Sequence, residues 1–381
     1  MIDLPSVIRP GDGILWGQAC AEPQTLVEAL VSQRARLGAV GCFLGSSYSG
    51  IVGPGHADHL RLSSYCGTGA NRALADAGVL ELLPVPYSQL GILIRERKIG
   101  ADVVMLQVSP PNARGEYSLG LAADYLVPAL DACRAIVAEV NDQVPWTHTA
   151  RLLTKDDFDL VVDSSRPPAT PPARPPGELD LAIARHALPF VPDGAVLELG
   201  IGALPDALCS LLGRHEGLRV HSGTVGDGVI ELAERKIVSR IDAAMLIGSR
   251  KLFDFARDNE RVRLHSSEYT HGAAILSKQP RFAAINSAVE VDLSGQVNGE
   301  AAGESYVGAV GGALDFIRAA NQSPGGVSLT MIPSSRIVER LSGPVSVPRS
   351  EAGVIVTEKG AADLRGCPLR ERERRLRAIA R

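Results

Sequence analysis

The sequence predicts an α/β protein made of two halves, each built on an open, mostly parallel β-sheet covered by helices. Three observations lead to this prediction. Short apolar runs alternate with amphipathic stretches in both halves, a proline-dense segment separates the halves, and 381 residues fit two domains. Because a chain of this length buries roughly three quarters of its unfolded surface, it needs neither disulfides nor metals to hold its cores.

The first half contains a strand–helix–strand pattern. Apolar runs at 38–44 and 102–108 are typical of buried strands. Residues 119–133 place apolar side chains at helical spacing, with Tyr125 on the apolar face, and a further strand is expected at 135–140. A strand, a helix and a second strand in this order predict a parallel sheet.

The segment 165–176 breaks the composition. It reads Ser-Arg-Pro-Pro-Ala-Thr-Pro-Pro-Ala-Arg-Pro-Pro and has no helical or strand period. Such a sequence favours an extended polyproline II conformation. We therefore expect an N-terminal α/β domain over 1–165, a linker over 166–176 and a C-terminal α/β domain over 177–381. The alternative is that the segment is a ligand for a proline-recognising domain.

The second half repeats the α/β pattern. The apolar run 195–199 leads into a glycine turn and a helix, and further strands are expected at 243–247, 283–285 and 353–357. The last residues, 369–381, are dense in Arg and Glu, which is typical of a solvated helix face.

Composition excludes several function classes. The 39 Lys and Arg residues against 43 Asp and Glu residues give a net charge of -4, which argues against nucleic-acid binding. No apolar run reaches the ~18 residues of a membrane span, so we expect no membrane partner. The N-terminus lacks the basic and apolar regions of a signal peptide, and the six cysteines form no C-x-x-C pair. We therefore expect reduced thiols, a cytoplasmic location and no metal site.

Residues 197–206 carry the clearest local motif. They read Leu-Glu-Leu-Gly-Ile-Gly-Ala-Leu-Pro-Asp, so an apolar strand ends in Gly-x-Gly and a helix follows. The first free N–H groups of such a helix can bind an anion. The candidate ligand-binding residues are Gly200, Gly202, Ala203, Leu204 and Pro205. This is not the dinucleotide fingerprint, because Pro205 replaces the third glycine. The alternative is a turn that only connects a strand to a helix.

A second glycine cluster lies at 307–316 and again runs into helical sequence. Its backbone N–H groups could face a phosphate or an oxyanion, and the alternative is a flexible turn. Several carboxylates lie near glycines or in strands. They are Asp227, Glu268, Glu290 and Asp292, and the competing interpretation of each is a capping or turn residue.

Five segments together resemble the acetyl-CoA hydrolase / 4-hydroxybutyrate CoA-transferase family, which belongs to the family I CoA-transferases. They are 103–125, 138–148, 197–208, 283–298 and 307–320. The resemblance implies two α/β domains related as in a CoA-transferase-like duplication, with the active site in a cleft between them. It also implies a homodimer, an acyl-CoA thioester and a small carboxylate as substrates, and no tightly bound cofactor.

In this family a glutamate attacks the thioester and forms a glutamyl-CoA intermediate. The resemblance places that glutamate in the stretch His221-Ser222-Gly223-Thr224-Val225-Gly226-Asp227-Gly228. The histidine and the Asp-Gly pair are in register, but Gly223 stands at the nucleophile position. Since glycine has no side chain, the usual covalent step cannot run through this residue.

The resemblance also implies an oxyanion hole made by a glycine N–H and an asparagine side chain. The glycine corresponds to Gly308, and His271 stands where the asparagine is expected. Gly311 and Gly312 complete the implied CoA-binding loop. A lysine often found after the following helix has no counterpart in 320–325.

Four functions remain open at this point. The chain could hydrolyse an acyl-CoA with water activated by Glu268 or Asp227, or transfer CoA through a carboxylate from elsewhere in the chain. Alternatively, it is a catalytically impaired acyl-CoA-binding or regulatory member of the family. An unrelated α/β enzyme with another cofactor is the remaining possibility.

Overall fold

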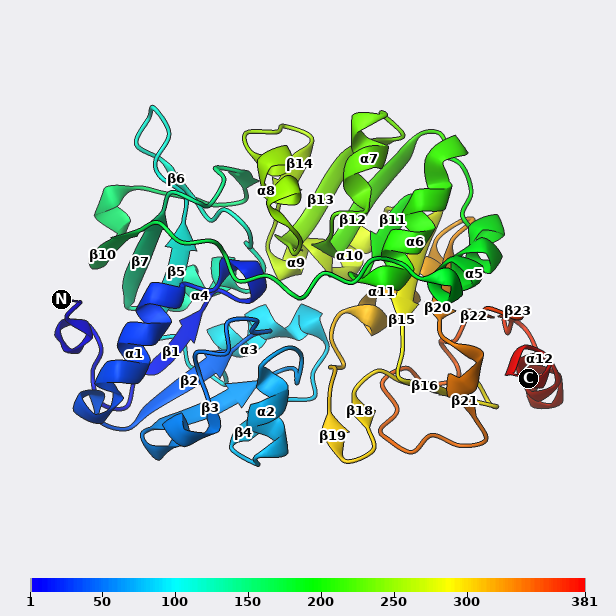
Figure 1. Ribbon diagram of the computed structural model, residues 1–381, viewed down its shortest axis with the longest axis horizontal. Helices are drawn as coiled ribbons and strands as arrows, with labels where there is room; N and C mark the ends of the chain where they lie inside the picture. The colour runs from blue at the N-terminus through cyan, green and yellow to red at the C-terminus, as the bar shows by residue number, and fades with distance from the viewer. Residues whose placement is uncertain (1, 381) are drawn as a thin grey trace. The chain divides into compact units, whose positions relative to one another are not determined.

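The computed structural model describes residues 2–380, which form two compact units (Figure 1). The first unit contains the chain up to Pro171 together with 244–268 and 305–307. The second unit contains 172–243, 269–304 and the chain from Gly308 onward.

The first unit is built on a seven-stranded sheet in which every strand is parallel to its neighbours, in the order β10-β7-β5-β1-β2-β3-β4. The strands are β1 (Gly13–Trp16), β2 (Val40–Leu44), β3 (Leu60–Ser64), β4 (Leu80–Leu82), β5 (Val103–Val108), β7 (Ala135–Asn141) and β10 (Leu160–Ser164). Its helices are α1 (Gln24–Leu37), α2 (Asn71–Asp76), α3 (Leu90–Arg95), α4 (Leu126–Ala132) and α8 (Arg250–Ala256). The strand order changes direction between β1 and β5, as in doubly wound folds.

Short strands complete the first unit. Parallel β8 (His148–Thr149) and β14 (Val262–Leu264) pair with each other, as do antiparallel β6 (Tyr117–Ser118) and β9 (Leu152–Leu153). The central strand β5 is buried at all six positions, which is expected when helices cover both faces of a parallel sheet. Its one polar side chain, Gln107, donates to the Cys20 carbonyl and accepts from Asn141.

The second unit holds the strand order β23-β22-β20-β15-β11-β12-β13, with β23 antiparallel to β22 at the edge. The strands are β11 (Val196–Leu199), β12 (Leu218–Val225), β13 (Val238–Leu246), β15 (Phe282–Ser287), β20 (Val327–Met331), β22 (Val354–Thr357) and β23 (Gly360–Asp363). Its helices are α5 (Glu178–Ala187), α6 (Ala203–Leu211), α7 (Val229–Glu234), α10 (Ala273–Leu276), α11 (Ala313–Gln322) and α12 (Leu369–Ala380). The short helix α9 (Ser267–Thr270) and strand β13 pass from one unit to the other.

Small strands lie outside this sheet. They are β16 (Glu290–Asp292), β17 (Val297–Asn298), β18 (Ala301–Ala302), β19 (Ser305–Tyr306) and β21 (Ile337–Val338). Strand β16 lies between β17 and β21.

The predicted α/β class with mostly parallel sheets is confirmed, as is the strand–helix–strand order of the first half. The helix predicted at 119–133 is wrong in its first part, because helix α4 begins at Leu126. Before it the backbone is held by chain-distant partners: Ala123 donates to the Ala244 carbonyl, and Leu121 accepts from Leu246. The preceding apolar side chains are buried by these contacts rather than by a helix, so their spacing was misleading.

The compact units differ from the predicted contiguous domains at two stretches. The chain passes between the units at 171–172, within the predicted linker, but 244–268 and 305–307 belong to the first unit rather than the second. Strand β14 in this segment pairs with β8, and Leu246 bonds to Leu121. The sequence of 244–268 shows only a strand and helix pattern, which does not indicate which sheet receives it.

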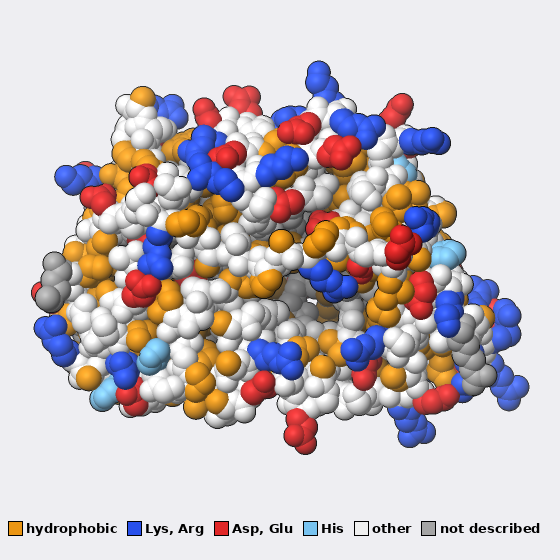
Figure 2. All heavy atoms as spheres, in the orientation of Figure 1, with side chains coloured by type: hydrophobic (Ala, Val, Ile, Leu, Met, Phe, Trp, Pro, Cys, Tyr) orange, Lys and Arg blue, Asp and Glu red, His pale blue; other side chains and the backbone are white. Residues whose placement is uncertain are grey.

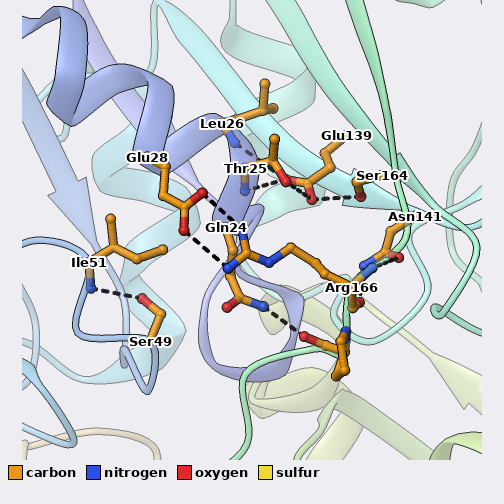
Figure 3. Close-up of polar contacts among 11 residues, drawn as sticks. Gln24, Thr25, Leu26, Glu28, Ser49, Ile51, Glu139, Asn141, Ser164 and Arg166 are labelled. Atoms are coloured by element: carbon orange, nitrogen blue, oxygen red, sulfur yellow. Dashed lines mark hydrogen bonds and ion pairs between the residues drawn. The ribbon is translucent and has the colours of Figure 1, made fainter.

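The start of the proline-dense segment is attached to the first unit (Figure 3). Arg166 forms a two-point ion pair with Glu28 at 2.9 and 3.1 Å, and its carbonyl accepts from Asn141. The Gln24 side chain donates to the Pro167 carbonyl at 2.9 Å. Residues 172–175 are exposed and without regular structure. Of the predicted linker, residues 166 and 167 are therefore bonded to the first unit, and the exposed residues 172–175 are the part that resembles a linker.

We predict that a protease of broad specificity, such as proteinase K, cleaves first within 169–177. Trypsin is unsuitable because proline follows both Arg166 and Arg174. The two fragments should co-elute in gel filtration, because 244–268 of the second fragment packs within the first unit. Denaturing electrophoresis with mass spectrometry would locate the cut. Initial cleavage inside 195–243, or separation of the fragments without denaturant, would contradict this description.

Candidate active site

Strand β12 supplies one wall of the candidate site in the second unit. Alternate residues of a strand face the same side, so His221 and Gly223 share one face of β12. The buried His221 ring forms a hydrogen bond through Nε2 to the Thr270 carbonyl at 2.9 Å. This bond fixes the chain directly before His271 against the strand that carries Gly223.

His271 is buried at 4% exposure and held on several sides. Its Nδ1 lies 2.9 Å from Thr270 Oγ1, and its ring packs against Phe316 of α11 with ring centroids 4.5 Å apart. Its Nε2 faces the backbone of two glycines. A Cβ on Gly223 would lie 2.9 Å from Nε2, and a Cβ on Gly312 would lie closer still.

These distances mean that the imidazole occupies the space that side chains at positions 223 and 312 would need. Real Cβ atoms do not approach other heavy atoms to within 3.0 Å, so any larger residue at either position must displace the buried ring. His271, Gly223 and Gly312 therefore form one packed group, drawn from the chain after α9, from β12 and from the start of α11. The resemblance pointed to His271 and Gly223 separately, and the structure brings them together.

Gly308 is placed differently from the expectation. Its N–H donates to the Glu300 carbonyl at 2.9 Å, and a Cβ on Gly308 would overlap the carbonyl oxygen of Gly299. The need for glycine here follows from this close approach of two backbone segments. A role for the Gly308 N–H as an oxyanion donor would require it to exchange the Glu300 carbonyl for substrate.

The Gly-x-Gly motif has the local structure that the sequence predicted. Strand β11 ends at Leu199, and α6 begins at Ala203 with Pro205 in its first turn. Gly202 adopts φ 106°, a conformation that favours glycine, and open space lies beside it. Gly200 and Leu204 are half-buried. Binding of a ligand by this loop stays a prediction.

The two carboxylates proposed to activate water lie in different surroundings. Glu268 belongs to the first unit and forms an ion pair with Arg95 of α3. Asp227 lies in the second unit, half-buried directly before α7 and close to Asp206. Burial raises the pKa of Asp206, and the charge of Asp227 adds to this effect. The partner of Glu268 could not be found from sequence, because Arg95 is 173 residues away along the chain.

The strand carboxylates serve local structure, as their competing interpretation stated. Glu290 accepts from the backbone N–H and hydroxyl of Ser342 at 3.0 and 2.9 Å. Asp292 accepts from Ser294 and from Gln296, which closes the turn after β16. These contacts satisfy both carboxylates without a ligand.

Glu198 was not predicted as a site residue, although it lies within the motif strand β11. The side chain is 4% exposed and accepts from the Ile285 N–H at 3.1 Å and from Asn286 Nδ2 at 2.8 Å. Burial raises the pKa of Glu198 from its ordinary value of 4.5 to about 8. A charged residue inside an otherwise apolar strand was the available signal.

Among residues 2–380, no group of three or more His, Cys, Asp or Glu side chains could hold a metal ion. Within the same range, no helix has the length and apolar character needed to cross a membrane.

Two domain families match the chain. The acetyl-CoA hydrolase/transferase N-terminal domain matches residues 3–163, and the acetyl-CoA hydrolase/transferase C-terminal domain matches residues 248–381. The Gly-x-Gly loop and Gly223 lie between these two ranges.

Similar proteins cover nearly the whole chain. It is 32% identical to the 4-hydroxybutyrate coenzyme A transferase of Clostridium kluyveri over 403 aligned positions, which span 98% of this chain and 92% of that protein. The structure of RipA from Yersinia pestis has a TM-score of 0.92 and 28% identity, with 99% of this chain and 92% of RipA covered. The structure of 4-hydroxybutyrate CoA-transferase from Porphyromonas gingivalis has a TM-score of 0.83 and 29% identity, with the same coverage.

We predict that Glu198 makes stability depend on pH. An acid whose pKa is higher in the folded than in the unfolded state loses folded-state stability as pH rises between the two values. The free energy of unfolding of the parent should fall relative to that of Glu198→Gln between pH 5 and 8, by at most about 1.4 kcal/mol per pH unit. Urea unfolding at several pH values measures this difference.

The matched control is Glu234→Gln, which changes an exposed carboxylate of the same unit. Its stability should follow the pH dependence of the parent. If Glu198→Gln and the parent also show parallel pH dependence, Glu198 does not titrate in this range.

Proposed function

Because the chain belongs to the acetyl-CoA hydrolase/transferase family, we propose that it acts on an acyl-CoA thioester and that water is the attacking nucleophile. The observation that carries this proposal is the packing of His271 against Gly223. No side chain at 223 can attack the thioester, and the imidazole fills the space that one would need. Hydrolysis is the family reaction that needs no protein-bound CoA intermediate.

We assign three roles in this reaction. The Gly-x-Gly loop at 200–205 binds CoA with the open N-terminal turn of α6. His271 donates a hydrogen bond from Nε2 to the thioester oxygen as negative charge develops there. This requires Nδ1 to accept from the Thr270 hydroxyl, which the 2.9 Å contact allows. Asp227 is the preferred base, because Glu268 is neutralised by Arg95.

The proposed hydrolysis has two steps, addition of water to the thioester and loss of CoA. Asp227 takes a proton from water, and the water oxygen bonds to the thioester carbon. The carbonyl electrons move onto oxygen, where His271 stabilises them. When the carbonyl re-forms, the carbon–sulfur bond breaks, CoA leaves as a thiolate and takes the proton from Asp227. The products are a carboxylic acid and CoA.

CoA transfer is the second candidate function. It is favoured by the similarity to the Clostridium kluyveri protein, which is a 4-hydroxybutyrate coenzyme A transferase. Because residue 223 is glycine, a carboxylate at another position would have to carry CoA to a small carboxylate acceptor. The comparisons give no support to the third possibility, a catalytically impaired acyl-CoA-binding subunit.

Three further expectations stay proposals. They are a homodimer, a cytoplasmic location, and the absence of a tightly bound cofactor beyond the CoA thioester itself. The substrate class follows the family, in which CoA thioesters are substrates.

We predict that His271→Ala lowers kcat for acyl-CoA hydrolysis by about 10²–10³, the usual cost of removing one oxyanion donor. His271→Asn should retain more activity, because an amide can donate to the same oxygen. His186→Ala is the matched control, since His186 is exposed on α5. Loss of the thioester absorbance band reports hydrolysis. Unchanged kcat in His271→Ala would remove His271 from the reaction.

We predict that Gly223→Glu and His271→Asn are coupled. Gly223→Glu alone should lower the melting temperature, because its Cβ overlaps the buried imidazole. Adding His271→Asn should recover much of that loss. The double variant should also form a CoA thioester at residue 223 that borohydride reduces and mass spectrometry locates.

The two readouts have separate consequences. If the two substitutions change stability additively, the packing argument is wrong. If the stable double variant binds acyl-CoA but forms no adduct, position 223 does not lie at the reacting centre. If the unmutated chain forms a CoA adduct, another carboxylate is the nucleophile and transfer replaces hydrolysis.

A further inference from the structure

A groove of about 550 Å³ opens on the second unit, and of the residues discussed so far it includes Asp292 and the turn that follows it. Three segments line it: the turn after β16, the loop that follows β21, and the first turn of α12. The volume is typical of small-molecule sites. None of the Gly-x-Gly loop, Gly223, His271 and the 308–312 loop contributes to it.

The carboxylates of this groove are already ion-paired or hydrogen-bonded. Arg377 binds Glu339 through both terminal nitrogens at 2.8 and 2.9 Å, and its Nε binds Glu373 at 2.9 Å. Asp292 accepts from Ser294 and Gln296. Arg377 is thus shared by Glu339 and Glu373, and Asp292 accepts hydrogen bonds from neutral side chains, so the negative charge of the wall is only partly compensated by these contacts.

Arg372 connects the three segments of the groove wall by hydrogen bonds. Arg372 of α12 donates to the Ser294 carbonyl at 3.4 Å, to the Arg349 carbonyl at 2.5 Å and to the Cys367 carbonyl at 3.2 Å. These bonds join the turn after β16, the loop after β21 and the start of α12. The groove is thus a fixed feature of the fold, formed by three connected segments.

Three arginines in the groove are not paired with a carboxylate of the residues that the structure describes. The side chains of Arg340, Arg349 and Arg370 are exposed, and no carboxylate among residues 2–380 forms an ion pair with them. Arg340 and Arg349 come from the loop after β21, and Arg370 comes from α12. Figure 2 shows Lys and Arg side chains at the right-hand edge of the molecule, where Figure 1 places α12.

Apolar side chains stand beside these cations. Val345 is 47% and Leu369 is 55% exposed, and Leu341 also lines the groove. Exposed large apolar residues next to unpaired arginines suit a ligand that carries both an anionic group and an apolar part. An arginine fork holds two oxygens of a carboxylate or of a phosphate equally well. A phosphate group carries up to about two negative charges and a carboxylate carries one, so three exposed arginines in one groove favour a ligand with phosphate groups.

We propose that this groove binds a multiply charged organic phosphate, with its phosphate groups on Arg340, Arg349 and Arg370 and its apolar part on Val345 and Leu369. This site is separate from the proposed acyl-CoA site and does not depend on the proposed function. It gives the protein a second small-molecule ligand that contacts none of the residues assigned to hydrolysis.

Isothermal titration with ADP as the probe tests the proposal. The parent should bind ADP with 1:1 stoichiometry, and the triple variant Arg340→Gln/Arg349→Gln/Arg370→Gln should bind it at least about tenfold more weakly, a 1.4 kcal/mol loss. The matched control is Arg185→Gln, which removes an exposed arginine of α5 in the same unit. It should bind ADP like the parent. Pyrophosphate should bind the groove and adenosine should not, because the cations recognise the phosphates.

Because CoA itself contains phosphates, the titration is repeated with saturating CoA. Unchanged ADP affinity supports a separate site, and displacement of ADP by CoA overturns it. The proposal also fails if the parent does not bind ADP at millimolar concentration, or if the triple variant binds it as tightly as the parent. Acyl-CoA turnover of the triple variant is measured in parallel, so that a loss of the proposed catalytic function is recognised separately.

Discussion

The candidate active site depends on one packing constraint. The His271 ring fills the space that a side chain at position 223 or 312 would occupy, so both positions are glycine. A buried interior has no spare volume into which a displaced ring could move. The two glycines are therefore required by the histidine, and the histidine is held by Thr270 and Phe316. Backbone packing thus decides which side chains fit at positions 223 and 312.

Much of the fold could be predicted from sequence because parallel strands leave a local signal. Runs such as Val103–Val108 are buried on both faces, and their composition alone indicates a strand. Strand β12 was missed because its residues, Leu-Arg-Val-His-Ser-Gly-Thr-Val, mix polar and apolar types. The helix predicted at 119–133 began too early because burial by distant segments gave the same spacing as an amphipathic helix.

The site was harder to predict for a related reason. A motif identifies candidate residues along the chain. The groups that form ion pairs or hydrogen bonds with those residues come from elsewhere in the sequence. Arg95 compensates Glu268, the Glu300 carbonyl takes the Gly308 N–H, and no local pattern indicates either partner. The resemblance supplied His271 and Gly223 as separate positions, and only the three-dimensional packing shows that each restricts the other.

The assignment of 244–268 to the first unit has a consequence for biosynthesis. The N-terminal sheet is complete in sequence by Ser164, yet its unit also needs this later segment and the short stretch 305–307. During translation, the contacts of 244–268 with β8 and with Leu121 can form only after that segment has been synthesised. Until then the N-terminal region lacks these contacts, and incompletely folded regions are the species on which chaperones act. A shortened gene ending in the proline-dense segment would yield an incomplete unit rather than an independent domain.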